Sequence, residues 1–320
     1  MGKVCLGFDI GSNSLKAAVL RGDEIRIEDV RLPENMVNEA GDIALPHAFA
    51  QFLRQVRKDL SLPRGPAALV LPPNQVICRL VNMPRMTVEQ LLLNLPYEFS
   101  DFIQDAADLY HCDYAVCEEA EGDDAGISMM AAVAAKEVLA GYTRMFAQAG
   151  FKLKIVLPQE MALVQLCRLR GMGECCFVDL GHQFTRIMVV RGDRVQATRQ
   201  IALGGRNLDG IVAGELGVAP FLANTYKTTN YQDVLAIPAV AEICDRIAVE
   251  ILKVINFYQY TYRSSELEGI YLVGGGANMP LLRQSIENTV GLPLLNPEKL
   301  LLETGAAIGA FAAGAVMGGE

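Results

Sequence analysis

The chain has 320 residues, of which 51% are hydrophobic and 20% are charged, and this composition is typical of a folded globular protein of one or two domains. Its formal net charge is −9 and it has no long run of Lys or Arg, which argues against nucleic acid as the main partner. No secretory signal precedes the first apolar strand, and no Cys-x-x-Cys pair occurs among the eight cysteines. We therefore expect a cytoplasmic protein with free thiols.

The first predicted element is an apolar strand that ends at Asp9 and leads into the turn Asp9-Ile10-Gly11-Ser12-Asn13. A second strand, a hairpin turn at Gly22 and a third strand over residues 24–31 follow. Glycine lets the backbone approach a ligand, and successive N–H groups in a tight turn form an anion site. This turn is a candidate phosphate loop.

An inserted subdomain is predicted between residues 75 and 132. It reads as a strand, a helical stretch from Glu89 to Phe99, and two further strands around an acidic loop at 118–124. The apolar segments Val81–Pro84 and Leu91–Leu93 predict a groove for an extended peptide. The alternative is that these leucines pack the core of the insertion itself.

The second half of the chain repeats the first strand and turn. Cys5, Asp9 and Gly11 recur at Cys175, Asp179 and Gly181, and the register continues without a gap into a hairpin turn at Gly192 and a strand over 194–199. This favours duplication over two unrelated hairpins. An acidic residue beside a phosphate site repels the anion unless a cation intervenes, so the pair Asp9 and Asp179 predicts Mg²⁺, bound mostly through water. The alternative is that each Asp only caps its turn.

A third glycine cluster follows the predicted strand Ile270–Val273. Gly274, Gly275 and Gly276 lie between this strand and a helix that starts at Pro280, which predicts a phosphate or adenosine pocket. The cluster lacks the Gly-Lys-Ser/Thr of a Walker loop and the acidic partner of a Rossmann fingerprint. A final helix from Thr304 to Ala315 is rich in small residues, which predicts close packing.

Together these three turns resemble the signature of the superfamily of actin, heat-shock chaperone ATPases and sugar kinases. Within it, the chain resembles the PilM family of type IV pilus assembly proteins over nearly its whole length. The segments that carry this resemblance are 81–86 with the helical stretch that follows to Phe99, 113–114, 134–137, 142–150, 203–205 and 267–282. It implies an α/β fold of two related actin-like (RNase H-like) lobes with a nucleotide cleft. Lobe one would span 1–172, lobe two 173–303, and 304–320 would be a C-terminal helix that returns to lobe one.

The resemblance also implies ATP and Mg²⁺ as cofactors. The implied cofactor-binding residues are Asp9, Gly11, Ser12, Asn13, Lys16, Asp179, Gly181, Thr185, Asn224, Lys227, Gly274, Gly275 and Gly276, with Asp9 and Asp179 also at the metal. Relatives often have a Glu where this chain has Asn224, and an amide gives a weaker hydrogen bond to the ribose than a carboxylate. Gln104 replaces a Pro found in many relatives, so we expect the local loop to differ.

Glu160 corresponds to a residue that orients the attacking water in ATPases of the superfamily. The alternative is a Glu favoured in the first turn of a helix by the helix dipole. We expect weak ATPase activity at most.

The implied function is a cytoplasmic ATP-binding scaffold of type IV pilus or related secretion assembly. Its partner would be the cytoplasmic N-terminal tail of a PilN-like inner-membrane protein, which would recruit it to the membrane; pilus motor ATPases and a second copy are further expected partners. Two alternatives stay open, an FtsA-like filament-forming cell-division protein and a small-molecule kinase. A kinase of this fold needs an acidic base beside the acceptor hydroxyl and typically a longer chain, and no spare acidic residue stands out in this sequence. An FtsA-type protein carries a basic amphipathic tail, which residues 314–320 do not resemble.

Overall fold

The computed structural model describes residues 4–22, 24–38, 40–103, 106–119, 126–263, 265–298 and 306–317. The chain divides into two compact units. Unit 1 comprises Met1–Gly171, Gly192–Gln196 and Phe311–Glu320, and unit 2 comprises Met172–Arg191 and Ala197–Ala310. Gln104, positions 120–124 of the acidic loop and positions 304–305 of the predicted final helix lie outside the described residues.

Unit 1 is built on a five-stranded sheet with the order β3-β2-β1-β4-β8. Its strands are β1 (Leu6–Ile10), β2 (Ser14–Arg21), β3 (Glu24–Arg31), β4 (Gly65–Leu71) and β8 (Phe151–Pro158). β1, β4 and β8 run parallel, so their carboxyl ends meet at one edge of the sheet, while β2 and β3 are antiparallel to their neighbours. The three strands predicted for residues 4–31 are confirmed.

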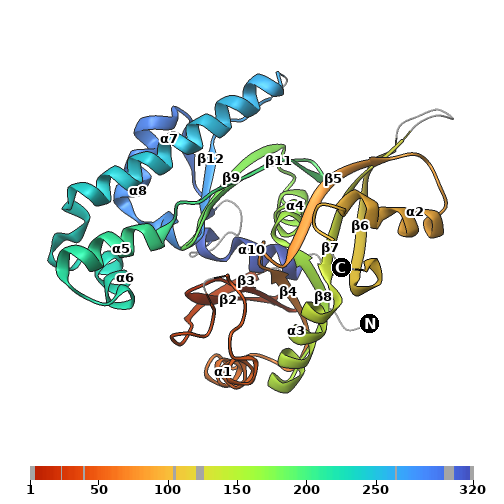
Figure 1. Ribbon diagram of the computed structural model, residues 1–320, viewed down its shortest axis with the longest axis horizontal. Helices are drawn as coiled ribbons and strands as arrows, with labels where there is room; N and C mark the ends of the chain where they lie inside the picture. Colours follow the sequence, from red (N-terminus) through yellow and green to blue (C-terminus); the bar gives the residue numbers. More distant parts are fainter. Residues whose placement is uncertain are drawn as a thin grey trace. The chain divides into compact units, whose positions relative to one another are not determined.

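Helices cover both faces of this sheet (Figure 1). α1 (Pro46–Asp59) and α3 (Lys136–Ala149) pack on one face, where Phe8, Leu53 and Phe146 are completely buried. Side chains alternate along a strand, so Gly7 and Asp9 point to the opposite face. That face carries α4 (Gln159–Leu169) and the part of α10 (Ala306–Met317) from Phe311 on.

Two glycines permit backbone-to-backbone packing on the second face. A Cβ atom at Gly7 would collide with the carbonyl oxygen of Ala312 in α10, and one at Gly314 would collide with the carbonyl oxygen of Ala162 in α4. The small residues Ala312 and Gly314 thus allow the final helix to lie directly on β1 and α4. The sequence predicted close packing of this helix but attributed it to Gly305, Ala306, Gly309 and Ala310. The helix ends at Met317, two residues beyond the predicted Ala315.

Unit 2 is built on a second five-stranded sheet with the order β11-β10-β9-β12-β13. Its strands are β9 (Glu174–Leu180), β10 (Thr185–Arg191), β11 (Arg194–Ile201), β12 (Ile270–Val273) and β13 (Leu294–Leu295). The first three residues of β11 group with unit 1. α7 (Pro238–Thr261) and α8 (Pro280–Val290) pack on one face around Ile251 and Ile286. The remaining helices are α5 (Gly205–Leu216), α6 (Pro220–Thr229) and the 3₁₀ helices η3 (Tyr231–Ala236) and η4 (Gly275–Asn278).

The duplication extends further than the sequence indicated. The repeat predicted three matching strands, whereas the two sheets match over five, because β4 and β8 take the places of β12 and β13. β12 and the start of α8 lie where the sequence predicted them. The predicted end of β11 at Arg199 is wrong by two residues, since its ladder continues to Ile201.

The insertion forms a separate three-stranded antiparallel sheet within unit 1, with the order β5-β7-β6. The strands are β5 (Val76–Met83), β6 (Tyr110–Glu119) and β7 (Ile127–Ala135), so the insertion extends three residues past the predicted position 132. Its own core comprises Val81, Met83, Leu91, Leu95, Phe99, Met129, Ala131 and Val133. In the described residues, β5 and β6 each pair only with β7, which leaves two open strand edges.

The prediction of one continuous helix from Glu89 to Phe99 is wrong. α2 spans Val88–Asn94 and is followed by the 3₁₀ helix η1 (Leu95–Phe99), and the short 3₁₀ helix η2 (Ala107–Leu109) precedes β6. Pro96 causes the break, because it has no N–H to donate to the preceding turn. Thr87 and Gln90 fix the start of α2 through a capping box, with bonds of 3.2 and 3.0 Å. No helix in the described ranges combines the length and apolar character needed to cross a membrane.

Candidate functional site

The first Asp-x-Gly turn joins β1 to β2 in unit 1. The N–H of Gly11 donates to the carbonyl oxygen of Ser14 at 2.9 Å, and the carbonyl of Asn13 accepts from Leu32 at 2.9 Å, so the turn is held at both ends. The ammonium of Lys16 lies over the turn, since a Cβ atom on Gly11 would be 3.1 Å from Nζ. The turn therefore presents a cation beside a glycine backbone, which suits an anionic group.

Charge alternates across the three strands next to this turn. Asp9 on β1 pairs with Lys16 on β2, which pairs with Asp29 on β3. Asp9 is only 7% exposed, and burial raises the pKa of its carboxyl above the usual range. Lys16 lowers that pKa and Asp29 raises it further. A buried carboxylate in this environment is better stabilised by an additional cation, as the Mg²⁺ prediction requires.

Glu160 lies in the first turn of α4 and is 6% exposed. Its position relative to Asp9 follows from the sheet: Asp9 and Leu157 both pair with Val70, from opposite sides. Asp9 and Leu157 are therefore two strand spacings apart, about 10 Å. Because α4 packs on the face toward which Asp9 points, Glu160 lies at the same edge and on the same face as the first turn.

The second Asp-x-Gly turn joins β9 to β10 in unit 2. Gly181 donates to the carbonyl oxygen of Phe184 at 3.1 Å, as Gly11 does to Ser14 in unit 1. Val273 pairs with Asp179, so the glycine cluster begins beside this aspartate. A Cβ atom at Gly274 would collide with Oδ1 of Asp179, and its φ of +82° strongly favours glycine. The structure thus brings Asp179 and the third glycine turn together.

The remaining glycines of the cluster have different surroundings. A Cβ atom at Gly276 would lie 2.9 Å from Cβ of Leu180, so this glycine is needed for close packing. A Cβ atom at Gly275 would meet nothing within 4 Å. Gly275 therefore faces open space, and a ligand could approach its backbone.

A pair of glycines after β11 packs against the second turn. Gly205 donates to the carbonyl oxygen of Gly181 at 3.0 Å, and Arg206 donates to that of His182 at 2.7 Å. Thr185 is fully buried, and its hydroxyl donates to the carbonyl of Leu203 at 2.9 Å. That hydroxyl links the turn to residue 203 and is inaccessible to a ligand in this structure. A direct contact between Thr185 and phosphate stays a prediction without support from the geometry.

A buried carboxylate, Asp209 on α5, completes this network. Lys227 on α6 lies 2.5 Å from its Oδ1 and also donates to the carbonyl of Gly205 at 3.1 Å. Nε2 of His182, from the second turn, lies 3.4 Å from Oδ2 of the same carboxylate. Burial raises the pKa of Asp209, and Lys227 opposes that rise. Asp209 was not among the site residues predicted from the sequence. Its position on the apolar face of a helix, between the buried Leu208 and Val212, could have indicated it.

The predicted site residues thus form two groups, one in each unit. The group in unit 1 comprises Asp9, Gly11, Ser12, Asn13, Lys16 and Glu160, and that in unit 2 comprises Asp179, Gly181, Thr185, Lys227, Gly274, Gly275 and Gly276. Asn224 is half-buried on α6, one turn before Lys227, so the two side chains lie on the same side of the helix.

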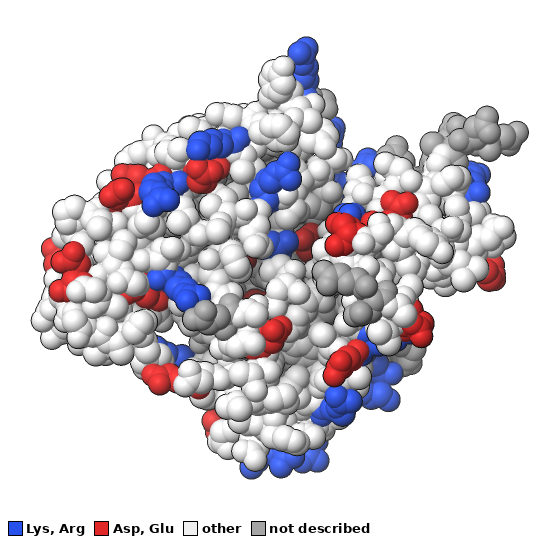
Figure 2. Space-filling view, in the orientation of Figure 1, with Lys and Arg blue, Asp and Glu red and all other residues white. Residues whose placement is uncertain are grey.

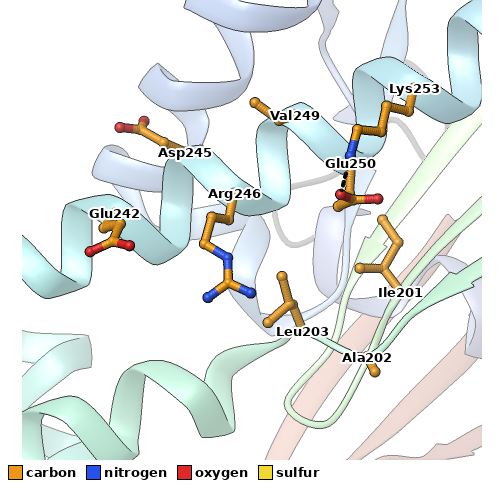
Figure 3. A pocket seen from close by; sticks show the side chains of 9 residues that line it. All are labelled: Ile201, Ala202, Leu203, Glu242, Asp245, Arg246, Val249, Glu250 and Lys253. Carbon is orange, nitrogen blue, oxygen red and sulfur yellow. Dashed lines mark hydrogen bonds and ion pairs between the residues drawn. The ribbon is translucent and has the colours of Figure 1, made fainter.

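A separate hollow in unit 2, of about 610 Å³, contains none of the predicted site residues (Figure 3). It lies between the end of β11 and α7, and its walls combine Ile201, Leu203 and Val249 with charged side chains of α7. Lys253 and Glu250 form an ion pair of 2.6 Å on its rim. No glycine turn lines this hollow, and its cations Arg246 and Lys253 lie among the acidic side chains of Glu242, Asp245 and Glu250.

The two matched sheets with their Asp-x-Gly turns define an actin-like ATPase fold. The chain is similar to the solved structure of a PilM-PilN type IV pilus biogenesis complex, with a TM-score of 0.81 and 21% identity over 98% of each chain. It is also similar to the ethanolamine utilization protein EutJ from Carboxydothermus hydrogenoformans, with a TM-score of 0.60 and 16% identity over 98% of this chain and 90% of that one. A third similar structure is the activator of 2-hydroxyisocaproyl-CoA dehydratase from Clostridium difficile with bound ADPNP (TM-score 0.50, 12% identity, 98% and 93% coverage).

At these identities the structures show a shared fold. The family is shown by a sequence match: the model of the family described as type IV pilus assembly protein PilM matches residues 7–301. This chain belongs to that family, as the resemblance of its motifs predicted.

Proposed function

We propose that this protein is an ATP-binding scaffold of type IV pilus assembly that holds the cytoplasmic tail of a PilN-like inner-membrane protein. The observation that carries the nucleotide part is the recurrence of one Asp-x-Gly turn at the same position of two matched sheets. Family membership, and the similarity to a chain solved in a PilM-PilN complex, support the pilus part. A fold relative with bound ADPNP supports nucleotide binding in general.

Each turn, taken in its own unit, has groups that suit part of a magnesium nucleotide. Lys16 and the backbone of Ser12 and Asn13 would hold phosphate in unit 1, since the N–H of Gly11 already donates to Ser14. The corresponding turn beyond Gly181, whose own N–H donates to Phe184, would do so in unit 2. The open backbone at Gly275 would receive the adenosine, with Asn224 and Lys227 as the proposed neighbours of the ribose and adenine. Asp9 and Asp179 would hold Mg²⁺ through water, and the metal would neutralise the phosphate charge. Glu160 would orient a water molecule, which supports slow hydrolysis.

The nucleotide proposal is tested by titrating the protein with Mg-ATP in a calorimeter. We expect one site per chain, and weaker binding in Asp9→Ala and Asp179→Ala. Unchanged affinity in both variants contradicts the assignment of the two turns. Turnover should be slow, below about 1 per second. Brisk turnover that depends on an added hydroxyl acceptor would favour the kinase alternative instead.

The insertion is the proposed site for the partner's tail. The apolar side chains of its helical segment 88–99 differ strongly in exposure. Leu91 and Leu95 are buried, whereas Leu93 and Tyr97 are 73% and 76% exposed. The insertion thus has both exposed apolar side chains and two open strand edges. An extended peptide can pair its backbone with an open edge and use such side chains as apolar anchors. The buried leucines show that the alternative reading, packing within the insertion, holds for part of this segment.

A synthetic peptide of the cytoplasmic tail of a PilN-like protein from the same organism tests this proposal. We expect the peptide to bind the full chain, and we expect Leu93→Ser with Tyr97→Ser to weaken it. The matched control is Phe257→Ser with Tyr260→Ser on α7, which removes an apolar pair of 59% and 78% exposure. No binding in the presence of Mg-ATP, or equal weakening by both pairs, contradicts the proposal.

The cellular setting is part of the same proposal. A cytoplasmic protein that holds a membrane protein's tail would be recruited to the inner face of the membrane, where pilus motor ATPases and further copies of the chain are the expected additional partners. Sedimentation with Mg-ATP separates this scaffold from an FtsA-like filament, because a filament pellets and a scaffold of defined size does not.

A further inference from the structure

One edge of unit 1 carries a concentration of positive charge that the proposed function does not use. The segments 54–64 and 144–154 together contain seven basic residues and one acidic residue, Asp59. The whole chain contains 28 basic and 37 acidic residues, so these two segments depart strongly from its average. The basic residues are Arg54, Arg57, Lys58, Arg64, Arg144, Lys152 and Lys154, and we call them the α1–α3 basic surface.

The fold brings the two segments together around Gly150, at the end of α3. Arg54 donates to the carbonyl oxygen of Gln148 at 2.7 Å, and Arg57 donates to that of Ala149 at 2.9 Å. A Cβ atom on Gly150 would be 3.5 Å from Nε of Arg57 and 3.7 Å from Nε of Arg64. The two guanidinium groups therefore converge on one point of the backbone.

The sheet places Lys152 and Lys154 at the same edge. Phe151 packs with Phe146 in the core under α1 and α3, so Lys152 points to the other face and the cations are spread around this edge. Gly65 pairs with Phe151 and Pro66 pairs with Lys152, so the start of β8 lies next to the residue that follows Arg64. β4 and β8 start here and run parallel to β1, whose carboxyl end leads into the first Asp-x-Gly turn. The basic surface therefore lies at the opposite edge of the sheet from Asp9. In Figure 2, Lys and Arg gather at the lower edge of the view, in the region that α1 and α3 occupy in Figure 1.

Structural roles explain only part of this charge. Arg54 and Arg57 bind the last carbonyl groups of α3, where cations are favourable because of the helix dipole. Asp59 accepts a hydrogen bond from Gln55 at 2.6 Å. Lys58, Arg64, Arg144, Lys152 and Lys154 are all exposed. Mutual repulsion among these cations disfavours the arrangement unless an anion is present.

The surface is cationic without apolar anchors. Its two segments contain two aromatic residues, Phe146 and Phe151, and both are buried. The surface therefore offers no stacking platform for nucleic-acid bases and no apolar anchor for a peptide. A contact made only by dispersed, flexible cations suits a fluid layer of anionic headgroups, to which polybasic surfaces bind through charge alone.

We propose that the α1–α3 basic surface binds the anionic lipid surface of the membrane. This contact is peripheral, it requires neither nucleotide nor the PilN-like tail, and it presents unit 1 to the bilayer by the edge opposite to the first Asp-x-Gly turn. A chain with a net charge of −9 is repelled by an anionic membrane on average, so this local surface also sets the orientation of approach.

Cosedimentation of the full chain with vesicles tests the proposal. We expect binding to phosphatidylcholine vesicles that contain about a third phosphatidylglycerol, no binding to phosphatidylcholine alone, and loss of binding well above about 0.1 M salt, where charge is screened within roughly 10 Å. The variant Lys58→Glu with Arg64→Glu and Lys152→Glu should bind on the order of a hundredfold more weakly, since each basic residue near a membrane contributes about fivefold.

The matched control is Arg168→Glu with Arg246→Glu and Arg263→Glu, at exposed positions elsewhere. Each substitution changes the charge by two units, so both triple variants go from −9 to −15. Thermal melting with circular dichroism checks that both fold. Absence of wild-type binding at low salt, equal loss in both variants, or binding to duplex DNA or polyglutamate in place of vesicles overturns the proposal. Because the assay contains neither ATP nor tail peptide, its outcome is independent of the proposed function.

Discussion

The ammonium of Lys227 lies 2.5 Å from Oδ1 of Asp209, although these residues belong to different helices of unit 2. The same ammonium donates to the carbonyl of Gly205, whose N–H donates to the carbonyl of Gly181 in the second turn. His182 closes the network from the other side of the carboxylate. The pair therefore connects α5 and α6 to the second Asp-x-Gly turn.

Removing the charge of Asp209 should destabilise unit 2. Both side chains are largely buried, with exposures of 3% for Asp209 and 11% for Lys227, so Asp209→Asn leaves an ammonium without its counter-ion. We expect a loss of about 3 kcal/mol in the free energy of unfolding, the usual cost of removing one partner of a buried pair. Urea denaturation measures it. The double variant Asp209→Leu with Lys227→Met should recover much of the loss, and an unchanged midpoint for Asp209→Asn contradicts this role.

Replacing Asp9 should increase stability while it weakens ligand binding. Burial raises the pKa of this carboxyl, so the ionised form at neutral pH costs folding free energy. We expect Asp9→Asn, without ligand, to unfold at a higher denaturant concentration at pH 7 than the wild type. Its affinity for Mg-ATP should fall by about tenfold or more, because a charge-assisted contact is lost.

The pH dependence of that difference checks its cause. The folded protein holds the Asp9 proton to a higher pH than the unfolded chain, whose carboxyl has the ordinary pKa of 3.8. Wild-type stability therefore falls, relative to Asp9→Asn, as pH rises from 3.8 through the raised pKa, and the difference is constant above it. A difference that grows instead as pH decreases contradicts burial as the cause.

Two neighbouring glycines provide a matched test of the third turn. Gly274→Ala should destabilise the protein by about 2 kcal/mol or more, because its φ is +82° and its Cβ would collide with Asp179. Gly275→Ala should leave stability within about 0.5 kcal/mol, since its Cβ faces open space. If nucleotide approaches this backbone, Gly275→Ala should nevertheless weaken Mg-ATP binding. Equal denaturation midpoints for both variants would contradict the packing described here.

The repeat and the glycine turns could be predicted because local residue patterns encode them. Asp9, Gly11 and the hairpin glycines occupy positions set by backbone conformation, and they recur at a constant spacing in both halves. The strand Ile270–Val273 was also predicted correctly, as an apolar run bounded by glycine. Matched motifs of this kind are visible without knowledge of tertiary contacts.

Features that depend on contacts between distant segments could not be predicted. Asp209 has no motif, and its importance arises only because α6 brings Lys227 beside it. The fully buried position of Thr185 likewise depends on the carbonyl of Leu203, 18 residues away. The correspondence of β13 with β8 could not be predicted from the sequence, because β13 has only two residues.

The insertion provides the last prediction, since one helical segment combines core packing with a proposed binding surface. Leu91 is 3% exposed and packs with Val81 and Phe99, so Leu91→Ala should leave a cavity and cost about 2–4 kcal/mol. Leu93 is 73% exposed, and Leu93→Ala should change stability by less than about 0.5 kcal/mol. Urea denaturation at fixed protein concentration compares the two.

Binding of the tail peptide should show a different pattern. Leu93→Ala should weaken it severalfold even though the fold is intact, because an apolar anchor contact is lost. Leu91→Ala should weaken it only under conditions in which the insertion is partly unfolded, so its effect should decrease at lower temperature. A peptide affinity that follows the stability of the insertion and ignores residue 93 would place the binding surface elsewhere on unit 1.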